Sequence, residues 1–273
     1  MNKNILVIGS NSELAQNTIR ELKNKNYNIY ATSRRIGIIE ENVSEFNLDV
    51  TKEYDFIHLK ERFSGIKFDT IINFAGIAVA SPVEELEENE LKKQLDVNLF
   101  GLLRIIKHFC PFLSENGKLI NISSMASYGV FPFLSPYELS KASADILLNS
   151  YSIENNVKVV SIRPGAVATK FWENSIELNQ NNFNNKNEKY KKEKEFLVKN
   201  AERNSLKANN PFLVAKKIAS IVELKNPRSV YNIGIDAKIA KLTRFIPQDI
   251  LNKLIKSILK IRLSKKQNDK QNT

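Results

Sequence analysis

The stretch ILVIGSNSELAQ, residues 5–16, decides how the chain begins to fold. It consists of a hydrophobic run, a glycine turn at Gly9 and the start of a helix. Such a turn places backbone N–H groups and the positive end of the helix dipole where a pyrophosphate can bind. We therefore interpret it as a nucleotide-binding loop, and its expected contacts are Gly9, Ser10, Asn11, Ser12 and Leu14.

Two glycines that are usual in such a loop are replaced here by Glu13 and Ala15. Ala15 adds one methyl group near the helix axis and is an accepted replacement. Glu13 would repel a phosphate unless its side chain points to solvent from the first helical turn, where the dipole favours it. Taken alone, the loop suits a strand, turn and helix without any phosphate equally well.

The rest of the chain alternates strand-like and helical patterns, and the longest helical pattern covers residues 87–113. Strands separated by helices of about ten or more residues form right-handed crossovers and a parallel sheet that is covered on both faces. The sequence therefore predicts an α/β fold, a Rossmann-like doubly wound three-layer sandwich with a seven-stranded parallel sheet. The seven runs are NILVIG, NIYATS, VSEFNLDV, FDTIINFAG, GKLINISS, VKVVSIRPG and SVYNIG.

One segment departs from this alternation. Residues 173–195 are rich in Asn, Lys and Glu and have few apolar anchors. Such a composition predicts a mobile insertion rather than a core element. The segment follows RPGAVATKFW directly, so we place it within a substrate loop that covers residues 170–210.

Composition and charge narrow the function classes. The 273 residues, 42% hydrophobic and 26% charged, suit one large domain, which we assign to residues 1–237. Residues 238–273 hold ten Lys or Arg against two acids, which is +8 of the net charge of +11. The body is thus only about +3, which does not favour a nucleic-acid partner. The single cysteine, Cys110, forms no intramolecular disulfide and is expected to be a buried thiol in a reducing cytoplasm.

The basic C-terminal segment, residues 238–273, is expected to form an amphipathic helix and a disordered tail. Between residues 247 and 263, apolar residues recur at helical spacing, with lysines on the opposite side. Such a helix could rest on an anionic membrane surface, pack over the substrate cleft or pack against a second subunit. No signal peptide or membrane-spanning run is expected. The stripe consists of Ile250, Leu251, Leu254, Ile255, Ile258 and Leu259, opposite Lys253, Lys256 and Lys260.

Seven motifs follow one another between residues 4 and 234: IGSNSEL, NLDV, NFAG, DVNLFG, NISSMAS, YELSK and RPGAVAT. In order and spacing the chain resembles the short-chain dehydrogenase/reductase family, and its nearest branch looks like the hydroxysteroid and retinol dehydrogenases. The resemblance implies hydride transfer between a nicotinamide nucleotide and a carbonyl or secondary alcohol, by a homodimer or homotetramer. Phe171 and Trp172 favour a lipophilic substrate. The alternatives are reduction of 3-oxoacyl thioesters on a carrier protein and a non-catalytic NADP-binding sensor.

Tyr137 and Lys141 are the strongest candidates for catalysis. Four residues of separation bring both side chains to one face of a helix, where the ammonium is expected to lower the phenol pKa. A second Tyr-x-x-x-Lys match, Tyr190 with Lys194, lies in the polar insertion and is expected to be solvated. The resemblance implies that Tyr137 is the general acid or base, that Ser124 binds the same oxygen, and that Asn98 positions a water in a proton relay to Lys141.

Cofactor preference is predicted from the end of the second strand. An enzyme that uses NAD places an acid there, whereas Ser33 and Arg34 suit a 2′-phosphate, so NADP(H) is favoured over NAD(H). His58 and His108 have no Cys, Asp or Glu at ligand spacing, and no metal is predicted. The family resemblance adds further cofactor contacts at Asp49, Val50, Asn73, Ala75, Gly76, Tyr137, Lys141, Pro164, Gly165, Val167 and Thr169.

Overall fold

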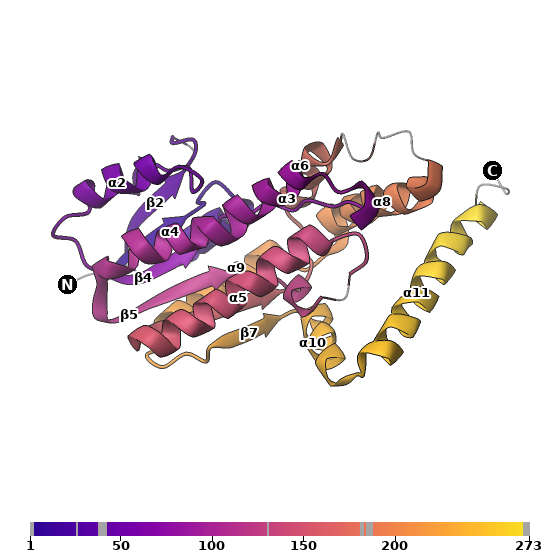
Figure 1. Ribbon diagram of the computed structural model, residues 1–273. Coiled ribbons are helices and arrows are strands. Elements are labelled where there is room, and N and C mark those ends of the chain that lie inside the picture. Colours follow the sequence, from indigo (N-terminus) through magenta and orange to yellow (C-terminus); the bar gives the residue numbers. More distant parts are fainter. Residues whose placement is uncertain are drawn as a thin grey trace.

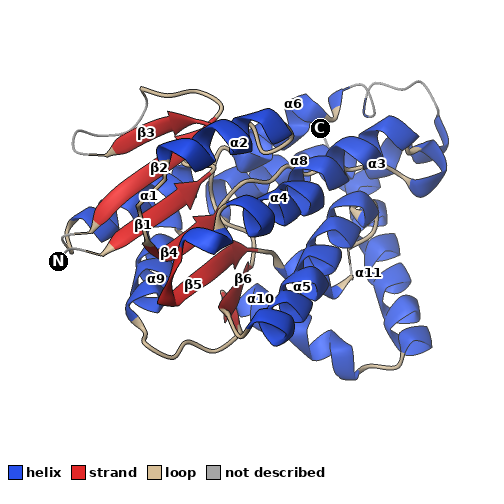
Figure 2. Cartoon of the chain, turned by 60° about the vertical axis from the view of Figure 1, so that its left-hand side comes forward, coloured by secondary structure: helices blue, strands red, loops and turns tan. Residues whose placement is uncertain are grey.

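The computed structural model describes residues 3–25, 27–37, 43–129, 131–180, 183 and 188–269. Seven parallel strands form one sheet in the order β3-β2-β1-β4-β5-β6-β7, with helices on both faces (Figures 1 and 2). The predicted Rossmann-like α/β fold with its seven-stranded parallel sheet is thus confirmed. The strands are β1 (Asn4–Ile8), β2 (Asn28–Ser33), β3 (Ser44–Asn47), β4 (Phe68–Asn73), β5 (Leu113–Ile122), β6 (Lys158–Pro164) and β7 (Val230–Ile233).

The helices connect consecutive strands and then form the C-terminal end of the described chain. The longer ones are α1 (Glu13–Lys23), α2 (Glu53–Arg62), α3 (Glu88–Leu95), α4 (Gly101–His108), α5 (Ser135–Asn155), α6 (Phe171–Leu178), α8 (Lys191–Lys207), α9 (Pro211–Glu223), α10 (Ile235–Leu242) and α11 (Gln248–Asp269). Short helical turns are η1 (Val83–Glu85), η2 (Asp96–Phe100), η3 (Cys110–Phe112), η4 (Met125–Tyr128), η5 (Glu188–Tyr190) and η6 (Thr243–Phe245).

The core lies in two apolar layers, one on each face of the sheet. Strand β1 contributes side chains to both layers. Ile5 and Val7 pack with residues of α1 and α9, whereas Leu6 and Ile8 pack with residues of α2, α4 and α5. This continuous apolar run is what a central parallel strand needs, because both of its faces are covered. The strand order reverses between β1 and β4, and ligands bind such sheets at the carboxyl ends of the strands that flank this point.

Cys110 belongs to the second of these layers. Its side chain is buried, and burial raises the pKa of the thiol to about 12, although a hydrogen bond with Tyr151 opposes the shift. A thiol with so high a pKa is a poor nucleophile at neutral pH. The predicted role of Cys110 as a small buried hydrophobe is confirmed.

The polar insertion is more ordered than its composition predicts. Most of helix α6 and the start of α8 lie within residues 173–195, whereas residues 181–182 and 184–187 are outside the described residues. Asn179 is buried, donates to the carbonyl oxygen of Ala78 at 2.9 Å and accepts from the N–H of Ala80 at 2.9 Å. These bonds tie the insertion to the loop after β4, so the prediction of a mobile insertion is wrong for this part.

Lys194 also corrects a prediction. Its side chain is only 4% exposed and forms an ion pair with Glu85 at 2.5 Å. The Tyr190–Lys194 pair was expected to be solvated, but its lysine is buried. Both charges lie under the contact between α8 and η1, and burial of two opposite charges together avoids the cost of burying either alone. The pairing joins segments far apart in the chain, which a composition count does not detect.

Candidate active site

The loop after β1 has the geometry of a phosphate cradle. Gly9 has φ +75°, and a Cβ added there would lie 2.6 Å from the backbone nitrogen of Ala75, so only glycine fits. The N–H groups of Gly9 and Ser10 donate to the carbonyl oxygen of Thr32 at 2.9 and 3.1 Å. Ser12 caps α1 by accepting from the N–H of Ala15 at 3.2 Å. The N-terminus of α1 thus directly follows the carboxyl end of β1, where an anion can bind to a helix N-terminus.

Glu13 and Ala15, which replace the usual glycines, are compatible with phosphate binding at this loop. Glu13 is exposed, as its place in the first turn of α1 favours, and Ala15 is fully buried. Leu14 packs against the apolar layer of α1, so its side chain serves the core rather than a ligand. Among the described residues, the buried Oδ1 of Asn11 has no hydrogen-bond partner, which leaves an acceptor beside the cradle. The positive φ of Gly9 and the N-terminus of α1 fit the pyrophosphate of a dinucleotide, whereas the Asn11 acceptor suits a hydroxyl donor.

The loop after β2 is held against this cradle. The hydroxyl of Ser33 donates to the carbonyl oxygen of Arg35 at 2.5 Å, and the side-chain amide of Asn11 donates to the same oxygen at 2.8 Å. Ser33 is therefore buried and serves the turn, whereas the side chains of Arg34 and Arg35 are exposed. The cationic groups that a 2′-phosphate would meet at this position are these two guanidinium groups.

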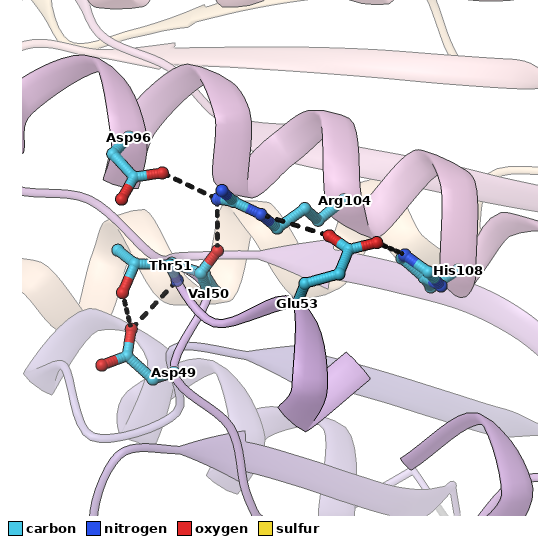
Figure 3. Close-up of polar contacts among 7 residues, drawn as sticks. All are labelled: Asp49, Val50, Thr51, Glu53, Asp96, Arg104 and His108. Atoms are coloured by element: carbon cyan, nitrogen blue, oxygen red, sulfur yellow. Dashed lines mark hydrogen bonds and ion pairs between the residues drawn. The ribbon is translucent and has the colours of Figure 1, made fainter. Parts of the chain in front are cut away.

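The segment predicted to contact adenine is held by an arginine, Arg104, which lies above it in Figure 3. Asp49 accepts from the N–H and hydroxyl of Thr51 at 3.0 and 2.7 Å. Burial would raise the pKa of Asp49, but these bonds and the Arg34 charge hold it below its ordinary value. Arg104 donates to the carbonyl oxygen of Val50 at 3.0 Å and to the carboxylate of Asp96 at 2.8 Å.

Sequence reasoning missed Arg104. The available signal was a lone cation in the apolar run GLLRII of α4, because a buried helix face rarely carries a charge without a specific partner. Its ion pair with Asp96 and its bond to the Val50 carbonyl position the segment that follows β3.

The two histidines have no metal-binding surroundings in the described part of the chain. The Nε2 of His108 lies 2.6 Å from the Oε1 of Glu53, and this hydrogen bond holds the pKa of Glu53 below its ordinary value (Figure 3). His58 stacks on Tyr54 with ring centroids 6.4 Å apart. No group of three or more His, Cys, Asp or Glu side chains that could hold a metal occurs among the described residues.

The loop after β4 runs past two of the predicted catalytic residues, Asn98 and Lys141. The side-chain amide of Asn73 donates to Oδ1 of Asn121 at 2.8 Å, and its own Oδ1 accepts from the N–H of Ala75 at 3.0 Å. A Cβ added at Gly76 would lie 3.3 Å from the Nζ of Lys141 and 3.5 Å from the Oδ1 of Asn98. The backbone at Gly76 thus runs directly past both polar groups.

Ser124, Tyr137 and Lys141 come together at the carboxyl end of β5. Ser124 follows this strand and caps η4 by accepting from the N–H of Ala126 at 3.1 Å. Tyr137 shares a side-chain hydrogen bond with Ser124. One helical turn further along α5, the Nζ of Lys141 donates to the carbonyl oxygen of Ile122 at 2.9 Å and lies 5.7 Å from the centroid of the Tyr137 ring. The structure therefore brings these three predicted residues into one cluster.

Asn98 joins the cluster through an irregular helix. The predicted helix over residues 87–113 is interrupted by a π-helical segment, η2, and Asn98 lies in its middle. The Asn98 amide donates to the carbonyl oxygen of Ile77 at 3.0 Å and to the hydroxyl of Ser140 at 2.9 Å, and it accepts from the N–H of Ile77 at 2.9 Å. Ser140 in turn donates to the carbonyl oxygen of Tyr137 at 2.7 Å. Periodicity could not predict this segment, although such segments recur at functional sites.

Burial reverses the expected effect on the tyrosine. It raises the pKa of Tyr137 to about 12, and only the hydrogen bond with Ser124 opposes the shift. The raised value is opposite to the lowering expected from Lys141, because loss of hydration dominates the shift. Burial also lowers the pKa of Lys141 to about 8, and the carboxylate of Asp145 opposes that change. The phenol thus stays protonated at neutral pH, which is the form that a proton donor needs.

Asp145 was not singled out in the sequence, although an acid one helical turn beyond Lys141 was the available signal. Its carboxylate accepts from the hydroxyls of Ser123 and Ser161 at 3.0 and 2.6 Å, and from the Nε of Arg163 at 2.8 Å. Ser123 faces away from Ser124, as the alternation along a strand predicts. These bonds hold the negatively charged carboxylate of Asp145 near the ammonium group of Lys141.

Replacing Asp145 with Asn should shift the pH profile of catalysis. A nearby carboxylate favours the ammonium, so its removal lowers the pKa of Lys141 further below its present value of about 8. If turnover needs the ammonium, activity is full below that pKa and falls as pH rises through it. The falling limb should therefore move to lower pH in Asp145→Asn. Turnover rates measured from acid to alkaline pH check this prediction, and Asp249→Asn, at an exposed position, is the control. A falling limb at the same pH in Asp145→Asn and in the unchanged chain would contradict it.

The segment predicted to hold the nicotinamide is fixed by three residues from later in the chain. The N–H of Gly165 donates to the carbonyl oxygen of Ile233 at 2.8 Å. Asp236 accepts from the N–H of Ala166 at 2.8 Å, and Asn209 donates to the carbonyl oxygen of Ala166 at 2.6 Å. Sequence reasoning missed Asn209 and Asp236, whose contacts cross long distances in the chain. The flanking predicted residues Pro164, Val167 and Thr169 are all buried.

Two aromatic rings, Phe171 and Trp172, lie beside the cluster of Ser124, Tyr137 and Lys141. The Phe171 ring at the start of α6 lies 6.2 Å from the Tyr137 ring, and the Trp172 ring packs edge-on against Phe171 at 5.7 Å. The Trp172 indole N–H donates to the carbonyl oxygen of Val167 at 2.7 Å. The indole is therefore tied to the same segment as the predicted nicotinamide contacts.

Comparison with known proteins identifies the family. A sequence profile described as short chain dehydrogenase matches residues 3–180, which is more than half of the chain. The chain belongs to the short-chain dehydrogenase family. This confirms the family resemblance that the seven motifs indicated, and it makes the protein an oxidoreductase.

Relatives in this family cover nearly the whole chain. The 3-amino-tetrahydro-pyrrolizinone reductase of Xenorhabdus hominickii is 30% identical over 86% of this chain and 88% of its own length. The 3-ketodihydrosphingosine reductase of Bacteroides thetaiotaomicron is 25% identical over 94% of this chain and 98% of its own. A short-chain dehydrogenase of Burkholderia cenocepacia, solved in complex with NADP, shares the fold with a TM-score of 0.73 at 18% identity, over 93% of this chain and 97% of that one.

Proposed function

We propose that this short-chain dehydrogenase is an NADP(H)-dependent oxidoreductase that reduces the carbonyl group of a lipophilic substrate, or oxidises the corresponding secondary alcohol. The observation that carries the proposal is the cluster of Ser124, Tyr137 and Lys141, in which the half-buried Tyr137 ring lies beside the Phe171 ring. A protonated phenol at the end of a nucleotide-binding crevice is suited to give a proton to a carbonyl oxygen.

Each residue of the cluster has a separate role in the proposed carbonyl reduction. NADPH, when bound, supplies the hydride that reaches the carbonyl carbon. Tyr137 gives its phenolic proton to the carbonyl oxygen, and Ser124 donates a hydrogen bond that stabilises the negative charge developing there. Lys141 stabilises the phenolate left behind, since an ammonium favours the charged form of its neighbour. Asn98 holds the backbone at Ile77 next to Gly76, where a water can pass a proton on to Lys141.

Carbonyl reduction is the direction that we propose. The pKa of Tyr137 near 12 keeps the acid form present throughout the neutral range, whereas alcohol oxidation needs the phenolate as a base. Two relatives are reductases by name, and the substrate named for one of them carries a keto group. The aromatic wall of Phe171 and Trp172 supports a lipophilic substrate.

A panel of carbonyl compounds tests this function against its alternatives. Oxidation of NADPH should be fast with a lipophilic ketone and slow with a 3-oxoacyl thioester. A reversed preference would support the thioester reductase that the sequence also allows. Binding of NADPH without turnover of any carbonyl would support a nucleotide sensor and contradict the proposal.

The preference for NADP(H) rests on Arg34. Its exposed guanidinium follows the buried Ser33, and these two residues occupy the strand end where an enzyme that uses NAD places an acid. Replacing Arg34 with Ser should weaken NADPH binding about tenfold to a hundredfold, the size of a lost charge-assisted hydrogen bond, and leave NADH binding unchanged. Fluorescence titration with both nucleotides measures the change, and Arg62→Ser, an exposed arginine at the end of α2, is the control. Equal loss for both nucleotides would contradict a 2′-phosphate contact.

We also propose a homo-oligomer formed through α5 and the helix beside it. Leu139, Ile146 and Ile153 recur every seven residues on α5 and are all exposed, and the exposed Phe100 lies on the neighbouring η2. Replacing Ile146 with Glu should reduce the mass in sedimentation to that of a monomer, whereas the exposed Ile57→Glu on α2 should not. An unchanged mass in Ile146→Glu would contradict this interface. We propose a cytoplasmic location, which suits the buried thiol of Cys110.

A further inference from the structure

Large apolar side chains stand on the outer face of α10 and η6. Ile235, Ile239, Leu242 and Phe245 are 77%, 60%, 59% and 79% exposed, although α10 buries Ala237 and Ala240 on its opposite side. The helix thus turns its small residues to the body and its large ones to solvent. This is the reverse of what an ordinary surface helix does.

Helix α11 follows α10 and η6 in the chain and carries a second exposed apolar stripe. Leu251 is buried, whereas Ile250, Leu254 and Ile258 form a stripe along the helix and are 57%, 48% and 41% exposed. Figure 1 shows α11 at the end of the molecule opposite α2, after the turn that follows α10. We call the exposed residues of α10, η6 and α11 the C-terminal ridge, and they are Ile235, Ile239, Leu242, Phe245, Ile250, Leu254, Ile258 and Ile261.

Positive charge flanks the ridge along its whole length. Among the described side chains of these elements, the exposed acid is Asp249, because Asp236 is half-buried and accepts from the N–H of Ala166. The exposed cations are Lys238, Lys241, Arg244, Lys253, Lys256, Lys260 and Arg262. Apolar side chains bordered by lysines on one helix face are what a helix needs at the surface of an anionic bilayer.

We propose that the C-terminal ridge docks on an anionic lipid bilayer, with its apolar side chains among the acyl chains and its lysines at the headgroups. A second copy of this chain is the less favoured occupant, since a symmetric contact would place each row of lysines against its like. The described chain has no helix that is long and apolar enough to cross a bilayer. The contact proposed here is therefore at the surface.

The ridge also lies next to the candidate active site. Asp236 at the start of α10 fixes the segment that follows β6, and the guanidinium of Arg244 lies 5.7 Å from the ring of Tyr128 in η4, just after Ser124. A bilayer at the ridge would present lipophilic molecules close to this cluster. That benefit rests on the proposed function, whereas docking itself does not depend on it.

Co-sedimentation of the full chain with lipid vesicles tests docking without any turnover measurement. The chain should pellet with vesicles of phosphatidylcholine containing roughly one third phosphatidylglycerol, remain in solution with phosphatidylcholine alone, and be released by high salt. Leu242→Ser with Phe245→Ser should weaken binding about tenfold or more through lost apolar burial. Lys238→Gln with Lys241→Gln should do so to a similar extent, roughly tenfold, through lost charge.

Matched controls lie on the opposite end and on α9. Ile57→Ser removes an exposed apolar residue, and Lys216→Gln with Lys217→Gln removes two exposed lysines, and both should bind vesicles like the unchanged chain. Circular dichroism and the thermal unfolding midpoint report that each variant is folded. Equal binding by the ridge variants and the unchanged chain, or no binding to anionic vesicles at all, would overturn the proposal. A change of oligomer mass in the ridge variants without vesicle binding would assign the ridge to a second copy instead.

Discussion

Replacing Tyr137 with Phe should lower the turnover of NADPH-dependent carbonyl reduction by a factor of about 10² to 10⁴, the usual contribution of a general acid. The change removes the phenolic oxygen and nothing else. The ring keeps its packing beside Phe171 and under the ammonium of Lys141, so NADPH affinity should change little. Single-turnover rates and fluorescence titration separate these two effects.

The control for this variant lies on the same helix. Tyr151 is another partly buried tyrosine of α5, and its phenol hydrogen-bonds with Cys110 rather than with the crevice. Tyr151→Phe should retain turnover while it removes the same chemical group. If Tyr137→Phe turned over as fast as the unchanged chain, the proton would have to come from elsewhere and the assignment would fail.

Replacing Gly9 with Ala should strongly weaken NADPH binding and destabilise the fold. A positive φ costs a non-glycine residue about 1–2 kcal/mol. The added Cβ would also lie 2.6 Å from the nitrogen and 2.9 Å from the Cα of Ala75, and backbone atoms cannot rotate away as a side chain can. Either the cradle moves or the loop after β4 does, and both carry predicted cofactor contacts.

Gly65 and Gly129 provide the matched comparison for Gly9→Ala. Their φ values, +81° and +71°, are close to that of Gly9, but an added Cβ would meet nothing within 4 Å. Gly65→Ala and Gly129→Ala should therefore lose only the backbone term, a fall in Tm of about 2–4 °C for each kcal/mol. Gly9→Ala should fall further and lose most of its affinity for NADPH. An equal fall in all three variants, with affinity intact, would show that close approach at Gly9 is not essential.

Local patterns in the sequence were sufficient for most of the fold. Each strand is a short apolar run between helical patterns, and a parallel sheet follows because helical crossovers allow few other arrangements. The catalytic cluster was also predictable in part, since one helical turn separates Tyr137 from Lys141 and the end of β5 carries Ser124. These features depend on neighbours in the chain.

The features that the sequence did not predict depend on contacts between distant segments. Burial of Lys194 requires Glu85 from a different loop, so polar composition alone indicated a solvated segment. The raised pKa of Tyr137 comes from its surroundings in the folded crevice rather than from the lysine one turn away. Arg104 and Asp145 likewise gain their roles from partners outside their own helices.

The most direct test of the account is a crystal structure of the complex with NADPH. We expect the nucleotide to cross the carboxyl ends of β1 and β4, with its pyrophosphate at Gly9 and its 2′-phosphate at Arg34. The nicotinamide should face the phenol of Tyr137, and the ribose next to it should lie within hydrogen-bond reach of Lys141. A nucleotide bound elsewhere, or a crevice in which Tyr137 and Lys141 both turn away from the nicotinamide, would contradict the central claim.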